Sequence, residues 1–96
     1  MPILQIEHPV ADFDAWKAAF DRDPIDRARG GVQRYRVMRP VDDPRYVVVD
    51  LEFANVEAAA TFREALEVLW KRVEGTVMHH PRARILDVVE TVQLRG

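Results

Sequence analysis

The strongest constraint on the fold is a repeated change of hydrophobic period along a short chain. Residues 2–8 alternate between two faces, as a half-buried strand does, and residues 32–38 and 45–53 show the same period of two. Residues 12–20 and 55–73 instead place apolar side chains every three or four positions, which is the period of an amphipathic helix. These segments predict strand, helix, strand, strand and helix, in that order.

Capping and turn residues mark the boundaries of the predicted helices. Asp12 and Asn55 stand where an N-cap is needed, because their side-chain oxygens can accept bonds from free amides of the first turn. Asp23-Pro24 ends the first helix, and a short turn-like helix is expected around residues 25–28. Gly75 is the predicted end of the second helix.

A β-branched run over residues 82–94 is predicted to be the last strand. Apolar residues occur on both faces of this strand, since Leu86 and Val88 compete with Ile85 and Val89 for the inward face. The sequence therefore allows either a β-bulge or burial of both faces of the strand. The whole order is β-α-β-β-α-β. Right-handed crossovers then give the strand order 4-1-3-2 with both helices on one face. We therefore predict a single α+β domain over residues 1–96, with a ferredoxin-like fold and an antiparallel sheet.

Composition narrows the classes of function. A chain of 96 residues with 48% hydrophobic and 31% charged residues is expected to form one ordered core. It has no cysteine, which excludes disulfides and thiolate metal sites and fits a cytoplasmic protein. Fourteen basic and sixteen acidic residues give a net charge of -2, so a nucleic-acid partner is not expected. No run is apolar enough to predict a membrane partner or a signal peptide.

The sheet face away from the helices is predicted to be a dimer interface. Setting Met38 opposite Tyr46 across the hairpin places Arg36 opposite Val48 and Arg34 opposite Asp50. Other residues expected on this face are Ile3, Gln5, Glu7, Val32, Glu52, Ile85, Asp87 and Val89. A half-apolar face with charges that pair across strands suits a homodimer through Arg34, Arg36, Val48, Asp50 and Glu52. The alternative is a solvated amphipathic sheet.

Several short strings carry a resemblance to a known superfamily. They are Glu7-His8 at the end of the first strand, DFDAWK at residues 12–17, RYR at 34–36, DLEF at 50–53 and PRARI at 81–85. In these strings and in element order the chain resembles the dimeric α+β barrel superfamily, and within it small proteins near the antibiotic-biosynthesis monooxygenase family. The resemblance implies a homodimer whose subunits hold small, often aromatic, molecules or haem between helices and sheet.

The resemblance also allows haem to be weighed against other ligands. Haem-degrading members use an asparagine on the first strand, a tryptophan on the second long helix and a histidine beyond it. Here the first strand offers Glu7 or His8, and Phe62 stands better than Trp70 at the tryptophan position. We therefore expect no haem and no other cofactor.

Candidate chemistry gathers around one histidine and several aromatic residues. His8 ends the first strand on the helix-facing side, where imidazole could accept a proton, and Tyr35 faces the helices from the edge strand. These two are the predicted catalytic residues. The predicted substrate-binding residues are Trp16, Phe20, Trp70, His79 and His80. The three histidines could meet at one end of the sheet, but their spacing matches no metal motif, so no metal site is expected.

Two hypotheses of function remain. The first is a cofactor-independent monooxygenase-like or cyclase-like enzyme acting on an aromatic or polyketide-like molecule. The second is a non-catalytic homodimeric binding or interaction module whose cavity is filled by its own side chains. Because no complete set of acid, base and nucleophile can be identified, the sequence leaves open whether the protein is an enzyme.

Overall fold

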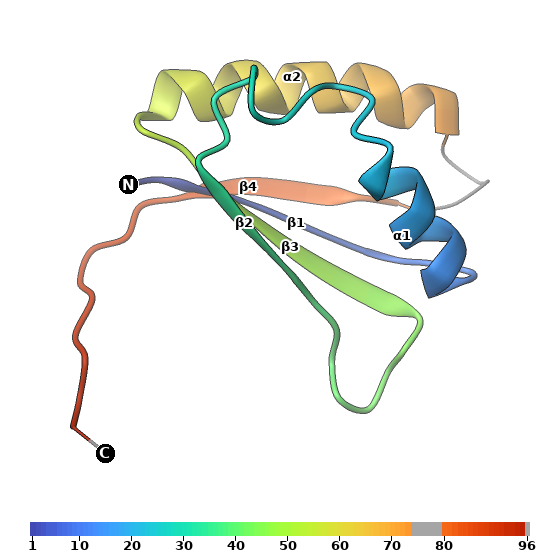
Figure 1. The fold of residues 1–96 in the computed structure, drawn as a ribbon, viewed down its shortest axis with the longest axis horizontal. Coiled ribbons are helices and arrows are strands. Elements are labelled where there is room, and N and C mark those ends of the chain that lie inside the picture. The colour runs from blue at the N-terminus through green and yellow to red at the C-terminus, as the bar shows by residue number, and fades with distance from the viewer. Residues whose placement is uncertain (74–79, 96) are drawn as a thin grey trace.

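A computed structural model describes residues 1–73 and 80–95 of the chain. The described residues form β1 (Ile3–Pro9), α1 (Phe13–Asp21), β2 (Arg34–Met38), β3 (Tyr46–Glu52), α2 (Val56–Val73) and β4 (Arg82–Leu86). All neighbouring strands pair antiparallel in the order β2-β3-β1-β4, which is the predicted order 4-1-3-2 read from the other edge. Both helices cover the same face of the sheet (Figure 1). The predicted ferredoxin-like α+β fold is therefore confirmed.

The two central strands supply the sheet side of the core. Leu4, Ile6 and His8 of β1 are buried, while the residues between them are only partly buried. Their partners on β3, Leu51, Val49 and Val47, are buried on the same face. Alternating side chains on a strand point to opposite faces, so this double row is the surface on which the helices pack.

Each helix begins at the predicted cap. The Asp14 backbone amide donates to Asp12 Oδ1 at 3.0 Å, and the Ala58 amide donates to Asn55 Oδ1 at 2.9 Å. On α1 the rings of Phe13, Trp16 and Phe20 follow one another at 5.8 and 5.1 Å between centroids. The predicted end of α2 at Gly75 lies outside the described residues. Neither helix of the described chain combines the length and hydropathy needed to span a membrane.

The segment between α1 and β2 consists of turns. The prediction of a short turn-like helix around residues 25–28 is therefore wrong. Asp23 and Asp26 have positive φ angles of 52° and 62°, which interrupt any right-handed helix. Each carboxylate accepts a hydrogen bond from a backbone amide further along the turn. The Arg27 amide donates to Asp23 Oδ1 at 2.8 Å, and the Arg29 amide donates to Asp26 Oδ1 at 3.2 Å. Such side-chain to backbone bonds stabilise the left-handed positions locally.

The register of the hairpin differs from the prediction by two residues. Met38 lies opposite Val48, Arg36 opposite Asp50, and Arg34 opposite Glu52. Tyr46 pairs with Pro9 of β1 instead of with β2. The connection is longer than expected because a turn closes within it, where the Asp43 amide donates to the Pro40 carbonyl at 3.2 Å. A shift of two keeps every side chain on its predicted face but brings each arginine opposite an acid.

Strand β4 is shorter than predicted and has the other face inward. Ile85 lies opposite Leu4 on the helix side, so its predicted place on the bare face is wrong, and Leu86 takes that face opposite Ile3. The strand ends at Leu86 because β1 begins at Ile3 and offers no further partner. Asp87 and Val89 therefore lie beyond the sheet, in the extended segment that leaves it in Figure 1.

Replacing Gly30 by Ala is predicted to destabilise the fold. A Cβ atom at this position would lie 2.5 Å from Phe62 Cδ1, and the Phe62 ring is buried in the core. Overpacking of this kind costs about 1–3 kcal/mol in the free energy of unfolding, measurable by urea denaturation. Ala28→Ser, at an exposed site in the same turn, should change the free energy by less than about 0.5 kcal/mol. Equal stability of the two variants would contradict the close contact.

Candidate functional site

A cavity of about 130 Å³ lies between the helices and the inward face of the sheet. The sheet contributes one wall, α1 and the turn after it a second, and α2 a third. The lining residues are Ile6, His8, Trp16, Ala19, Phe20, Asp23, Pro24, Ile25, Arg27, Val49, Leu51, Phe62, Leu66, Leu69 and Trp70. Most of these side chains are apolar, so the cavity suits an apolar ring of an organic molecule better than a strongly hydrated group.

The structure brings four of the predicted site residues to this cavity: His8, Trp16, Phe20 and Trp70. His8 meets the ring of Trp16 edge to face at 5.7 Å, and Trp16 stacks on Phe20 at 5.1 Å. Trp70 reaches the cavity from the end of α2 and is 8% exposed. Strands and helices distant in sequence thus assemble an aromatic wall around one imidazole.

Among the described residues, His8 is a titratable side chain that is almost completely buried. It is 1% exposed, and its Nδ1 lies 3.1 Å from the Pro9 carbonyl oxygen. Because a carbonyl can only accept, this hydrogen bond requires the proton on Nδ1. In this tautomer the neutral imidazole carries its proton on Nδ1 and not on Nε2.

Tyr35 does not line this cavity, although it was predicted to act beside His8. It is 43% exposed, and its ring meets Phe20 edge to face at 5.4 Å. It lines an adjacent hollow together with Asp23, Arg27, Ala28, Val32, Gln33 and Arg34. Phe20 contributes to the wall of the cavity on one side and contacts Tyr35 on the other.

Of the other two predicted histidines, the structure places His80 alone, and His80 does not line the cavity. His79 lies outside the described residues, and His80 is exposed, with a positive φ of 47°. Within residues 1–73 and 80–95, no three histidine, aspartate or glutamate side chains are grouped closely enough to hold a metal ion.

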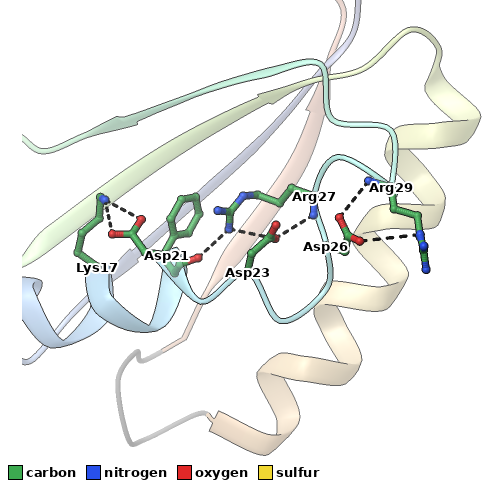
Figure 2. A network of polar contacts seen from close by, with 7 residues as sticks. Lys17, Asp21, Asp23, Asp26, Arg27 and Arg29 are labelled. Carbon is green, nitrogen blue, oxygen red and sulfur yellow. Dashed lines mark hydrogen bonds and ion pairs between the residues drawn. The ribbon is translucent and has the colours of Figure 1, made fainter.

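Asp23 and Arg27 are site residues that the sequence analysis missed, because it treated their segment only as a turn. Both line the cavity and the adjacent hollow. Arg27 Nη1 donates to the Phe20 carbonyl at 2.8 Å and lies 3.5 Å from Asp23 Oδ1. Figure 2 shows the Arg27 side chain directed back toward α1, whereas Arg29 points away. An arginine four positions after the aspartate of an Asp-Pro turn is too common in sequences to have predicted that Arg27 lines a cavity.

The opposite face of the sheet carries a polar row that crosses all four strands. Arg36 Nη2 pairs with Asp50 Oδ2 at 3.0 Å, Gln5 Nε2 donates to Asp50 Oδ1 at 3.1 Å, and Arg84 Nη2 donates to Gln5 Oε1 at 3.0 Å. Asp50 is only 7% exposed as a result. Beside the row, Arg34 Nη2 lies 2.7 Å from Glu52 Oε2, and Val48 is half-buried.

Tyr46, also on this face, has a perturbed hydroxyl. Burial raises the pKa of Tyr46 above its ordinary value of 10.0, and the charge and hydrogen bond of Glu7 raise it further.

Comparison with known proteins identifies the fold. No protein-family model matches the sequence, and neither does any curated protein. Among solved structures, SnoaB from Streptomyces nogalater, a cofactor-independent oxygenase, matches with a TM-score of 0.74 and 16% identity over 95% of each chain.

Two further structures come from proteins provisionally assigned to the antibiotic biosynthesis monooxygenases. The protein from Nitrosomonas europaea has a TM-score of 0.71 and 20% identity over 94% of this chain and 100% of its own. The one from Deinococcus radiodurans has a TM-score of 0.62 and 14% identity over the whole of both chains. The chain therefore has the ferredoxin-like α+β fold found in antibiotic biosynthesis monooxygenases, as the resemblance in its sequence predicted.

Proposed function

We propose that this protein binds a small aromatic molecule in the cavity and oxygenates it without a cofactor. The observation that carries the proposal is the juxtaposition of a buried His8 with the rings of Trp16, Phe20 and Trp70 around one cavity. The similarity to SnoaB, which is a cofactor-independent oxygenase, supports the same class of reaction. We expect the protein to act in the cytoplasm, since its cysteine-free sequence needs no oxidising compartment.

The size of the cavity favours a single ring. An apolar cavity of about 150 Å³ is large enough to bind benzene, and this one measures about 130 Å³. The tryptophan rings offer stacking or edge contacts to an aromatic ligand. Of the aromatic and polyketide-like substrates considered from the sequence, a one-ring phenol fits better than a fused ring system.

The chemistry we propose is oxidation of a phenol to a quinone by dioxygen. His8 accepts the phenolic proton, which leaves an electron-rich phenolate in an apolar site. The phenolate donates electrons to dioxygen, and a carbon–oxygen bond forms at the para carbon. That carbon loses its hydrogen, one oxygen atom becomes the new carbonyl, and the other leaves as water, so phenol and dioxygen give quinone and water.

A second candidate is a binding module without catalysis. Ligand pockets usually measure roughly 300–1,000 Å³, so a cavity of about 130 Å³ is small for a working active site. In this alternative the aromatic side chains mainly fill the space between helices and sheet. The two candidates differ in whether a bound phenol is turned over.

Ligand binding and turnover separate these candidates. We expect phenol or a methylphenol to raise the melting temperature, because a ligand at a hundred times its dissociation constant contributes about 2.7 kcal/mol to the folded state. We expect His8→Asn to lower phenol-dependent oxygen uptake by roughly 10²–10⁴-fold, as for loss of a general base, while the dissociation constant changes less than about threefold. Stabilisation without any oxygen uptake would favour the binding module, and no stabilisation by any one-ring phenol would rule out the ligand.

We also propose that the protein is a homodimer joined through the bare face of the sheet. Within one subunit Arg36 is ion-paired with Asp50, and Arg84 donates to the neutral amide of Gln5, so the charge of Arg84 is the one in this row that a second subunit would have to match. Apolar and half-buried side chains flank the row on both sides, and they include Ile3, Met38, Val48 and Leu86. This mixture is typical of a self-complementary interface.

Replacing Val48 by Lys tests this interface. Val48 lies opposite Met38 and Glu7 on the bare face, so a lysine there would replace an apolar contact of the proposed interface by a hydrated ammonium that must lose water on dimerisation. We expect light scattering to report a dimer for the wild type and a monomer for the variant at micromolar concentration. Glu57→Lys, on the exposed first turn of α2, should leave the dimer intact. A monomeric wild type would contradict the proposal.

A further inference from the structure

Arg27 is a largely buried cation at the edge of an apolar cavity. Its side chain is 14% exposed, although the residue belongs to a surface turn. It lines both the cavity beside Trp16 and the adjacent hollow beside Tyr35. A guanidinium is rarely placed against an apolar cavity unless something there stabilises its charge.

Several contacts hold the guanidinium in one orientation. It lies 3.9 Å from the centroid of Phe20 and 4.9 Å from that of Tyr35, both within cation–π range. Nη1 donates to the Phe20 carbonyl at 2.8 Å, which ties the side chain to the end of α1. A fixed guanidinium loses less entropy on binding an anion than a mobile one does.

The turn that carries Arg27 is itself strained. Asp23 and Asp26, on either side of Pro24-Ile25, adopt positive φ angles, which are costly for most residues other than glycine and which aspartate tolerates through its side-chain hydrogen bonds. The Arg27 amide donates to Asp23 Oδ1 at 2.8 Å, so the strained turn is bonded to the residue whose side chain returns to α1. Figure 2 shows this chain of contacts from Asp23 through Arg27.

The guanidinium retains binding capacity for a ligand. Among the described residues, only Nη1 makes a hydrogen bond from the side chain, so Nε and Nη2 have no acceptor there. The acid beside it is Asp23, whose Oδ1 lies 3.5 Å from Nη1 and already accepts a hydrogen bond from the Arg27 backbone amide. Arg34 in the same hollow is paired with Glu52. The planar fork of an arginine matches the two oxygens of a carboxylate.

We propose that Arg27 binds the carboxylate of an aromatic acid whose ring occupies the cavity. This inference rests on the proposed function, which requires a one-ring ligand in that cavity, and it adds the substituent that orients the ring. The substrate class is then a hydroxylated benzoic acid, with its carboxylate at Arg27 and its ring beside Trp16 and Trp70. Arg27 selects and positions this ligand, and the proton chemistry belongs to His8.

The test compares 3-hydroxybenzoate with 3-hydroxybenzamide, which has the same shape and no charge. For the wild type, calorimetry should give at least tenfold tighter binding of the acid. Arg27→Met should weaken binding of the acid at least tenfold and change binding of the amide less than threefold, so that the preference disappears. Arg29→Met removes an exposed arginine of the same turn that points away from α1, and it should keep the wild-type preference.

The outcomes separate failure of this inference from failure of the proposed function. If acid and amide bind the wild type equally, or if the preference survives in Arg27→Met, the anchor is wrong while the aromatic cavity stands. If neither compound binds the wild type, both the anchor and the one-ring ligand are wrong. Arg27→Lys covers the case in which Arg27→Met does not fold: it keeps the charge but lacks the fork, and we expect an intermediate preference.

Discussion

The pairing of β1 with β3 is the interaction on which the rest of the structure depends. These strands occupy the centre of the sheet, and their inward rows meet as Leu4 with Leu51, Ile6 with Val49, and His8 with Val47. All six side chains are buried, and both helices pack over them. His8 is part of this double row, so the imidazole of the candidate site is positioned by the core itself and not by a loop. The strand period places His8 on the helix-facing side, and the helices that cover this face bury it.

The outward face of the same strands is held by polar contacts and not by apolar packing. Arg36, Asp50, Gln5 and Arg84 form a continuous row because the register places them directly opposite one another. Exposed ion pairs contribute at most about 1 kcal/mol each, so the row adds little to stability. Its stronger effect is on specificity, since a shift of two residues in the hairpin would leave Arg36 opposite Val48 and only one of the two arginines of β2 opposite an acid. The row thus links strand alignment to the composition of the proposed dimer interface.

The candidate site combines rigid and strained parts of the fold. The sheet and α2 provide an apolar wall of regular structure, and the turn after α1 provides its polar edge. Positive φ angles at Asp23 and Asp26 are retained because their carboxylates bond to amides within the turn. Strain of this kind often accompanies a functional role. A ligand held there would lie between the imidazole of His8 on the sheet side and the guanidinium of Arg27 on the turn side.

Local properties of the sequence determined the order of elements, both helix caps and the faces of the central strands. They act over a few residues: Asp12 and Asn55 cap because their side chains reach the next turn, and Trp16 and Phe20 share a face because a helix repeats every 3.6 residues. Only the tertiary structure decided the hairpin register, since a shift of two residues leaves the alternation of β2 unchanged. It also decided the end of β4 at Leu86, where β1 has no further residue to pair with. The return of Arg27 to Phe20 spans only seven residues, but it depends on the positive φ angles of Asp23 and Asp26, which the sequence pattern did not reveal. The separation of Tyr35 from His8 depends on how strands and helices distant in sequence pack together.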